Sequence, residues 1–356
     1  MTSKISAQKV NMGRFFEDFT FNEVIQHATP RTITAGDCSL YIALYGARQP
    51  LFCSEPFAQS LGLATTPVDD LLAFHIAFGK TVPDISVNAV ANLGYADVRF
   101  LQPVFIGDTL TTSSQVIGLR QNSNNQSGVV YVRSTAINQR GEPVLSWVRW
   151  VMVRKNDLNR TAPMTVVPTL PNAVALEHLS IPSYFFAKKF DEKITGGQYY
   201  FEDYQIGERI NHAAGMTINP AEHSMATRLY QNNARLHFDD NLMQSSSFGQ
   251  RLVYGGVVIS MCRALSYEGL ENALSILAIN AGTHANPSFA GDTIYSATEV
   301  IEKSALNNGM GALRLRMLGI KNLNPSELNE FKTEAGYHPS VVLDLDYTVA
   351  MPRREG

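Results

Sequence analysis

Apolar and polar residues alternate along several stretches of this chain, and these stretches fall into two groups. Residues 342–349 alternate most regularly, as a strand with one buried face does. The sequence Arg140-Gly141-Glu142 is typical of a hairpin turn between two such strands. The long strands predicted are 109–121, 128–138 and 143–154 in the first group, and 293–301, 311–319 and 341–351 in the second.

A short helix is predicted ahead of each group of strands. Thr34 and Asp37 fit a capping box, in which two side chains satisfy free backbone N–H groups at a helix start. Asn219 and Glu222 fit a second box, with Pro220 at the first helical position. Asp37 and Glu222 are therefore interpreted as helix caps rather than as catalytic acids.

A second, more apolar helix follows in each group. In the first group it spans 71–78, after two aspartates and before Gly79, which we expect to end it. In the second group it begins at Gly255-Gly256 and runs to Leu265. A helix with an antiparallel sheet, formed twice, predicts an α+β fold.

The two groups are copies of one unit. Residues 16–18 recur at 201–203, and His27 recurs at His212, with the same offset of 185 residues. Similarity at a fixed offset signals a duplication. Because both copies keep this histidine, we expect it to serve the fold rather than the chemistry.

The stretch between the copies is rich in proline and predicts a linker with little regular structure. A chain of 356 residues is long enough for two domains with cores of their own. The organisation predicted is a first domain at 1–155, a linker at 156–197 and a second domain at 198–356.

The composition, 45% hydrophobic and 17% charged, is that of a globular protein in water. No apolar run approaches the ~20 residues that span a bilayer, and the first 13 residues lack the apolar core of a secretory signal. We therefore expect no membrane partner. The net charge of −3 argues against nucleic acid as a partner. Three cysteines without metal-type spacing favour a reduced, cytoplasmic location and no metal site.

One family has a characteristic order of elements: a helix start, a polar loop, a central helix opened by glycine, and then the motif Pro-Val-x-x-Gly-Asp-Thr-Leu. Residues 103–110 read Pro-Val-Phe-Ile-Gly-Asp-Thr-Leu and match the last of these closely. In these features the chain resembles the MaoC-like hydratases, which include the (R)-specific enoyl-CoA hydratases. The resemblance covers nearly the whole chain and implies a double hot-dog fold, with two tandem antiparallel sheets each wrapped around a central helix. The stretches 31–51, 78–93 and 226–238 are similar to family members that interconvert mesaconyl-CoA and β-methylmalyl-CoA.

The resemblance implies a hydro-lyase whose partner is an acyl-CoA substrate. Coenzyme A would be part of that substrate, so no separate cofactor is expected. Long edge strands favour pairing between chains, so a homo-oligomer is expected as well.

The family uses an aspartate and a histidine five positions apart, and these positions are Asn232 and His237 in the second copy. Imidazole titrates near neutral pH and suits proton transfer with water or with Cα. The asparagine cannot act as a base, but its amide can hold water or the thioester by hydrogen bonds. In the first copy the same positions are Ala47 and Phe52, which cannot transfer protons.

Glycines at a helix start let a thioester approach the free backbone N–H groups, which then stabilise enolate charge. The family glycine falls on Gly255, and Gly256 follows it. The aligned residue in the first copy is Asp70, whose charge would oppose an enolate. The resemblance therefore implies one active site for each chain, in the second copy.

Mesaconyl-CoA carries a free carboxylate, so its pocket should contain a cation. Arg235, two residues before His237, is the first candidate, and Arg228 is the second. If Arg235 holds the carboxylate, Arg235→Ala should raise KM far more for mesaconyl-CoA than for crotonyl-CoA.

The sequence leaves the second acid or base open between Glu222, another water and the carboxylate of the substrate itself. Two other functions also stay open. One is a hot-dog thioesterase, which would release free thiol. The other is a non-catalytic acyl-CoA-binding protein, which the asparagine at position 232 would suit.

Overall fold

The computed structural model describes residues 9, 12–181 and 189–354. Residues 182–188 of the predicted linker, and most of the first 13 residues, lie outside this part of the chain. Among the described residues, no helix is long and apolar enough to cross a membrane.

A single antiparallel sheet runs through the molecule, in the order β1-β4-β5-β6-β3-β8-β13-β10-β9-β7, with β2 also paired to β4. In the first half the strands are β1 (Val24–Gln26), β2 (Arg31–Thr32), β3 (Ala89–Phe100), β4 (Thr109–Gln121), β5 (Ser127–Ile137) and β6 (Pro143–Arg154). In the second half they are β7 (Arg209–Thr217), β8 (Ile276–Thr283), β9 (Thr293–Ala305), β10 (Met310–Lys321) and β13 (Val341–Pro352). The strands β11 (Lys332–Thr333) and β12 (Gly336–Tyr337) form a separate hairpin.

All six predicted long strands are present, within a few residues of their expected ends. The prediction missed β3 and β8, which join the two halves by pairing Tyr95 with Gly282 and Val98 with Ile279. Three register shifts interrupt the pairing of β3 with β6, so apolar residues do not alternate regularly along it. The first five residues of β8 are all buried, so this strand carries no polar alternation either.

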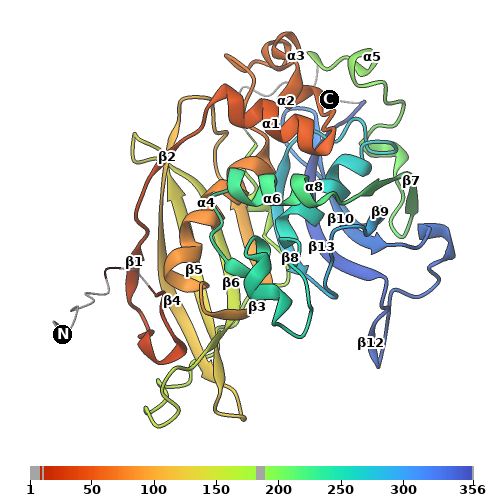
Figure 1. Ribbon diagram of the computed structural model, residues 1–356. Coiled ribbons are helices and arrows are strands. Elements are labelled where there is room, and N and C mark those ends of the chain that lie inside the picture. The colour runs from red at the N-terminus through yellow and green to blue at the C-terminus, as the bar shows by residue number, and fades with distance from the viewer. Residues whose placement is uncertain (1–8, 10–11, 182–188, 355–356) are drawn as a thin grey trace.

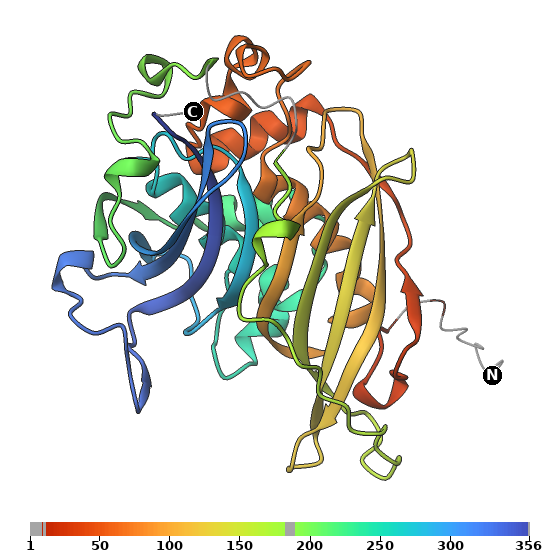
Figure 2. The same ribbon diagram turned by 180° about the vertical axis from the view of Figure 1, so that it is seen from behind.

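Helices lie on one face of the sheet (Figure 1), and Figure 2 shows the opposite face. The longer helices are α1 (Ala35–Tyr45), α4 (Asp70–Ile85), α6 (Pro220–Leu229) and α8 (Gly255–Leu265). The shorter α-helices are α2 (Pro50–Cys53), α3 (Glu55–Ser60), α5 (Glu192–Thr195) and α7 (Asp240–Gln244). Single 3-10 turns are η1 (Phe16–Asp18), η2 (Leu176–His178), η4 (Phe201–Asp203), η5 (Arg235–His237) and η6 (Pro325–Glu327).

The helix starts were predicted well, with one exception. Thr34 and Asp37 form the predicted capping box of α1. At α6, Pro220 is the first helical residue, but the box predicted at Asn219 is wrong. The Asn219 amide instead donates to the Glu222 carboxylate at 2.8 Å, and its side chain accepts no hydrogen bond from the backbone N–H groups of the helix start.

The predicted end of α4 at Gly79 is also wrong, because the helix continues to Ile85 and contains Pro83. Gly79 serves packing instead. A Cβ atom at this position would lie 1.9 Å from the carbonyl oxygen of Tyr230. The glycine therefore lets α4 approach the end of α6.

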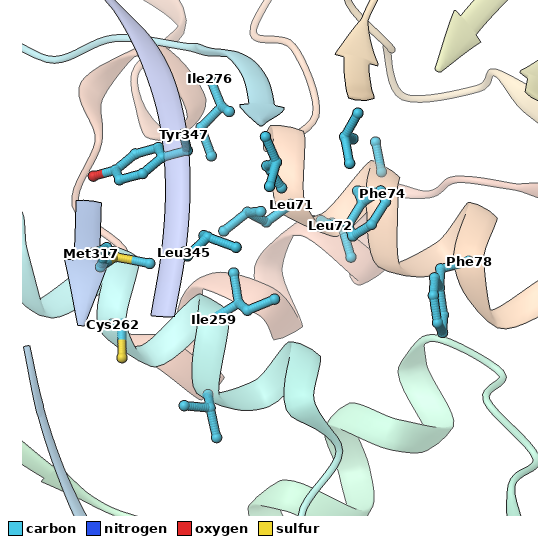
Figure 3. Close-up of a cluster of buried hydrophobic side chains, with 14 of the residues drawn as sticks. Leu71, Leu72, Phe74, Phe78, Ile259, Cys262, Ile276, Met317, Leu345 and Tyr347 are labelled. Atoms are coloured by element: carbon cyan, nitrogen blue, oxygen red, sulfur yellow. The ribbon is translucent and has the colours of Figure 1, made fainter. Parts of the chain in front are cut away.

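The main core lies between the helices and the sheet. Figure 3 shows Leu71 and Phe74 of α4 near Ile259 of α8, with Leu345 from β13 in the same cluster. All four side chains are buried. Burial of such apolar side chains is the main source of stability for this architecture.

The duplicated histidines serve the fold, as predicted. His27 contacts Ser114 through Nε2 at 2.7 Å, and His212 contacts Thr298 in the same way at 2.8 Å. Each therefore ties the edge segment of its half to the next strand.

The segment after β6 runs across the open face of the sheet (Figure 2). Val166 pairs with Leu119 of β4, and the backbone N–H of Val174 donates to the Asn280 side chain of β8 at 2.9 Å. The described part of the predicted linker thus has little regular structure but is attached to both halves.

Candidate active site

A cavity of about 270 Å³ lies between the two halves. The first half contributes residues of α4, β3 and β6, and the second contributes the segment after α6, the start of α8 and the segment after β8. His237, Asn232 and Gly255 all line this cavity. The sequence-based reasoning therefore selected residues that the fold brings together.

His237 ends the 3-10 turn η5, and its ring packs 5.5 Å from the ring of Tyr254. Its Nδ1 lies 3.0 Å from the carbonyl oxygen of Leu252. Because a carbonyl can only accept, Nδ1 carries the proton in the neutral ring, and Nε2 keeps a free lone pair. Burial lowers the pKa of His237 to about 4, so the ring is neutral at physiological pH.

Asn232 is 4% exposed and follows Gln231, whose φ of 52° is left-handed. Its Oδ1 accepts a hydrogen bond from the backbone N–H of Ala234 at 3.1 Å. This contact orients the amide and leaves its NH2 group as the available donor.

Gly255 is the first residue of α8, and among the described residues no side chain caps this helix start. A Cβ at Gly255 would lie 2.2 Å from Cε1 of His284, and one at Gly256 would lie 2.4 Å from the Tyr254 ring. Both glycines therefore allow close packing at a helix start whose N–H groups can face an anion. Of the two, only Gly255 lines the cavity itself.

His284, the residue directly after β8, lines the cavity and was missed by the sequence reasoning. Its Nε2 lies 3.1 Å from the hydroxyl of Tyr95 on β3. Burial and, to a smaller extent, charge repulsion by His237 lower its pKa to about 4. The repeat gave no signal for it, because the matching motif of each copy begins only at Phe105 and Phe289.

Comparison with known proteins shows which family this chain is similar to. A family model described as MaoC like domain matches residues 18–138. The beta-methylmalyl-CoA dehydratase of Chloroflexus aurantiacus is 55% identical over 97% of this chain and 99% of that protein. The mesaconyl-CoA hydratase of Cereibacter sphaeroides is 52% identical over 97% of this chain and 100% of that protein.

This chain belongs to the MaoC-like dehydratase family. A crystal structure of a putative MaoC domain dehydratase from Chloroflexus aurantiacus has a TM-score of 0.95 at 54% identity, with 98% of this chain and 100% of that chain covered. A Mycobacterium tuberculosis protein described as a double hotdog fold has a TM-score of 0.81 at 24% identity, covering 96% of this chain and 99% of that chain. The predicted double hot-dog fold is confirmed.

The first half of this MaoC-like chain has no comparable cavity at the equivalent place in the described structure. The space beside Ala47, Phe52 and Asp69 is only about 10 Å³. Asp69 caps α4 itself, accepting from the N–H of Leu71 at 2.9 Å, and Asp70 accepts from the N–H of Ile276 at 2.7 Å. The N–H groups at the start of α8 are thus free of any side-chain cap among the described residues, whereas Asp69 caps the corresponding start of α4.

The remaining predicted site residues do not reach the cavity. Arg235 and Arg228 are exposed, and neither lines it. The Arg228 Nε donates to the carbonyl oxygen of Ser224 at 3.2 Å. Glu222 is exposed and bonded to Asn219, which leaves it away from the cavity as well.

Proposed function

We propose that this chain is an enoyl-CoA hydratase that acts on mesaconyl-CoA, with His237 as its general base. The observation that carries the proposal is the free Nε2 of a neutral His237 in a cavity at the open start of α8. The high identity to a mesaconyl-CoA hydratase and a beta-methylmalyl-CoA dehydratase supports the choice of substrate.

In the forward reaction His237 Nε2 accepts a proton from water while the water oxygen bonds to Cβ. The electron pair of the double bond moves through Cα to the thioester oxygen, which forms an enolate. The imidazolium of His237 then returns a proton to Cα, and the thioester is restored. The sum is the addition of one water, which converts mesaconyl-CoA to β-methylmalyl-CoA.

The backbone N–H groups at Gly255 and Gly256 are proposed to stabilise the enolate oxygen. The Asn232 amide and His284 would hold the water in place. Asn232 is oriented by Ala234, and His284 by the hydroxyl of Tyr95. This mechanism needs no second acid or base, because His237 both accepts the proton of water and returns a proton to Cα.

The proposal includes no cofactor beyond the coenzyme A of the substrate. Among the described residues, no group of three or more His, Cys, Asp or Glu is placed to hold a metal. A cytoplasmic location and self-association are also part of the proposal, and size-exclusion chromatography with light scattering would test the latter.

A mass-resolved assay tests the function directly. The purified protein is incubated with mesaconyl-C1-CoA, mesaconyl-C4-CoA or crotonyl-CoA, and the products are separated. We expect a gain of one water on mesaconyl-CoA with coenzyme A still attached, and a loss of at least about 100-fold in kcat in His237→Ala.

Release of free thiol without hydration would instead identify a thioesterase. Binding of acyl-CoA without turnover of any of the three substrates would identify a binding protein. Unchanged hydration in His237→Ala would show that the base lies elsewhere.

A further inference from the structure

A buried arginine from the other half of the molecule lines the same cavity. Arg149 lies on β6, where it pairs with Tyr95 of β3, and it is 1% exposed. Its side chain lies on the face of the sheet that α4 covers, because it contacts Thr81 and Phe78 of that helix.

The guanidinium of Arg149 has no carboxylate partner among the described residues. Its Nη2 donates to the hydroxyl of Thr81 at 2.7 Å, and both terminal nitrogens lie 3.5 Å from the hydroxyl of Ser86. It sits 4.3 Å from the centre of the Phe78 ring, and its Nε has no partner within the described structure. These contacts hold the group in place but do not neutralise its charge.

Such a charge is costly unless something compensates it. A buried ion without a counter-ion loses its hydration and gains little in return. Burial lowers the pKa of Arg149 to about 10, which still leaves it charged at neutral pH. The fold therefore maintains a positive charge in a site that favours an anion.

Among the described residues that line the cavity, Arg149 is the only charged side chain. Among the described residues that line it, none is Asp, Glu or Lys, and the two histidines are neutral. Asn92 of β3 also lines the cavity, and both polar atoms of its buried side-chain amide lack a partner within the described chain. Two donors that could bind a carboxylate, the Nε of Arg149 and the amide of Asn92, thus have no partner within the described chain, and both residues line one largely apolar cavity.

Aromatic rings connect this arginine with the proposed reaction centre. The Phe78 ring beneath the guanidinium lies 5.9 Å from the rings of both Tyr95 and Tyr254. Tyr254 packs against His237, and Tyr95 packs against His284 at 5.6 Å. Two rings, Phe78 and a tyrosine, therefore separate the guanidinium of Arg149 from each of the two imidazoles.

We propose that Arg149, assisted by Asn92, binds the free carboxylate of a dicarboxylic acyl-CoA. This inference rests on the proposed function and names the residue that selects its substrate. In mesaconyl-CoA the carboxylate is attached to Cβ, at the opposite end of the acyl group from the thioester. With the thioester at α8, the carboxylate points towards the first half, where Arg149 lies.

The half without a catalytic histidine then supplies the specificity. A guanidinium binds a carboxylate through two parallel hydrogen bonds, which a neutral methyl group at the same place cannot form. The ion pair also offsets the negative charge of the carboxylate beside the carbon that water attacks.

Two unreactive thioesters test the anchor without any catalytic step. Succinyl-CoA carries a carboxylate on Cβ, and butyryl-CoA carries a methyl group there. Calorimetric titration of wild type and Arg149→Met should show a loss of about 100-fold in affinity for succinyl-CoA. Affinity for butyryl-CoA should change by no more than about twofold, because it makes no ion pair.

Two controls accompany this variant. Arg154→Met removes an exposed arginine from the same strand and should change neither affinity. Arg235→Ala tests the anchor favoured by sequence alone. Loss of succinyl-CoA selectivity in Arg235→Ala, with selectivity retained in Arg149→Met, would overturn the proposal.

Arg149→Met should fold, because replacing an uncompensated buried charge with an apolar side chain is often neutral or stabilising. If its melting curve shows otherwise, Arg149→Lys takes its place. Lysine keeps the charge but lacks the two-pronged geometry, so succinyl-CoA should bind at least about tenfold more weakly with butyryl-CoA unaffected. Unchanged succinyl-CoA affinity in the folded variant overturns the proposal.

The outcomes separate this inference from the proposed function. The protein could show selectivity for succinyl-CoA that depends on Arg149 and yet fail to hydrate mesaconyl-CoA. This result would support Arg149 as the carboxylate-binding residue and contradict the proposed hydratase function. Hydration of mesaconyl-CoA with full activity in Arg149→Met would support the hydratase function and contradict the role of Arg149.

Discussion

At the scale of single residues, the bond from His237 to the Leu252 carbonyl decides which nitrogen can react. It places the proton on Nδ1 and leaves Nε2 as an acceptor, while burial keeps the ring neutral. A base needs its neutral form, so the pH at which the ring becomes protonated sets the acid limit of activity.

We therefore predict that kcat/KM for mesaconyl-CoA stays level from about pH 8 down to about pH 5. Below this range it should fall as pH drops through about 4, because the lowered pKa of His237 delays protonation. His284, with its pKa also at about 4, adds to the same fall.

The measurement is a pH profile of kcat/KM, with circular dichroism at each pH to show that the protein remains folded. A fall centred near 6.5, the ordinary pKa of histidine, would mean that neither imidazole is desolvated as the structure describes.

Comparison of the two copies singled out His237, whose counterpart is Phe52, and the resemblance to the family singled out Gly255, whose counterpart is Asp70. The same reasoning could not find His284 or Arg149. Arg149 stands between apolar residues of a strand, and its burial becomes visible only when α4 covers that face. Both residues reach the site through the pairing of β3 with β8, which no local pattern predicts.

At the scale of elements, α4 shows why sequence signals for helix ends can fail. Gly79 was expected to stop the helix, yet the helix continues, since burial of its apolar face outweighs the helix propensity of one glycine. Tertiary contact with Tyr230 explains the residue better than any property of the helix itself.

Gly79→Ala should therefore destabilise the protein by about 3 kcal/mol, because its Cβ would collide with backbone that cannot move away. The matched control is Gly36→Ala in α1, where a Cβ would meet only the Thr34 hydroxyl, at 3.6 Å. That variant should be stabilised by about 0.5 kcal/mol, as alanine is the better helix former.

Urea unfolding curves of both variants give these free energies of unfolding. Equal effects of the two substitutions would mean that Gly79 is retained for helix flexibility and that the contact with Tyr230 carries no energy.

At the scale of the whole molecule, the duplication places equivalent residues face to face. Tyr45 and Tyr230 are separated by the repeat offset of 185 residues, and their hydroxyls lie 2.8 Å apart in the buried centre. In the same way β3 of the first half pairs with β8 of the second, so the two halves share one continuous sheet instead of the two separate sheets that the sequence predicted. The duplicated sequence predicted two similar halves, but it held no information on how they meet.

A double-mutant cycle on these tyrosines tests whether the central contact couples the halves. Tyr45→Phe or Tyr230→Phe alone should each cost about 1–2 kcal/mol, because each leaves a buried hydroxyl without its partner. The double variant should cost clearly less than the sum, by about 1 kcal/mol, since it removes both hydroxyls together. As a control, Tyr45→Phe combined with Tyr337→Phe, whose hydroxyl bonds to Asp344 in another cluster, should be additive. Additive costs for Tyr45 and Tyr230 as well would mean that this pair contributes nothing to the union of the two halves.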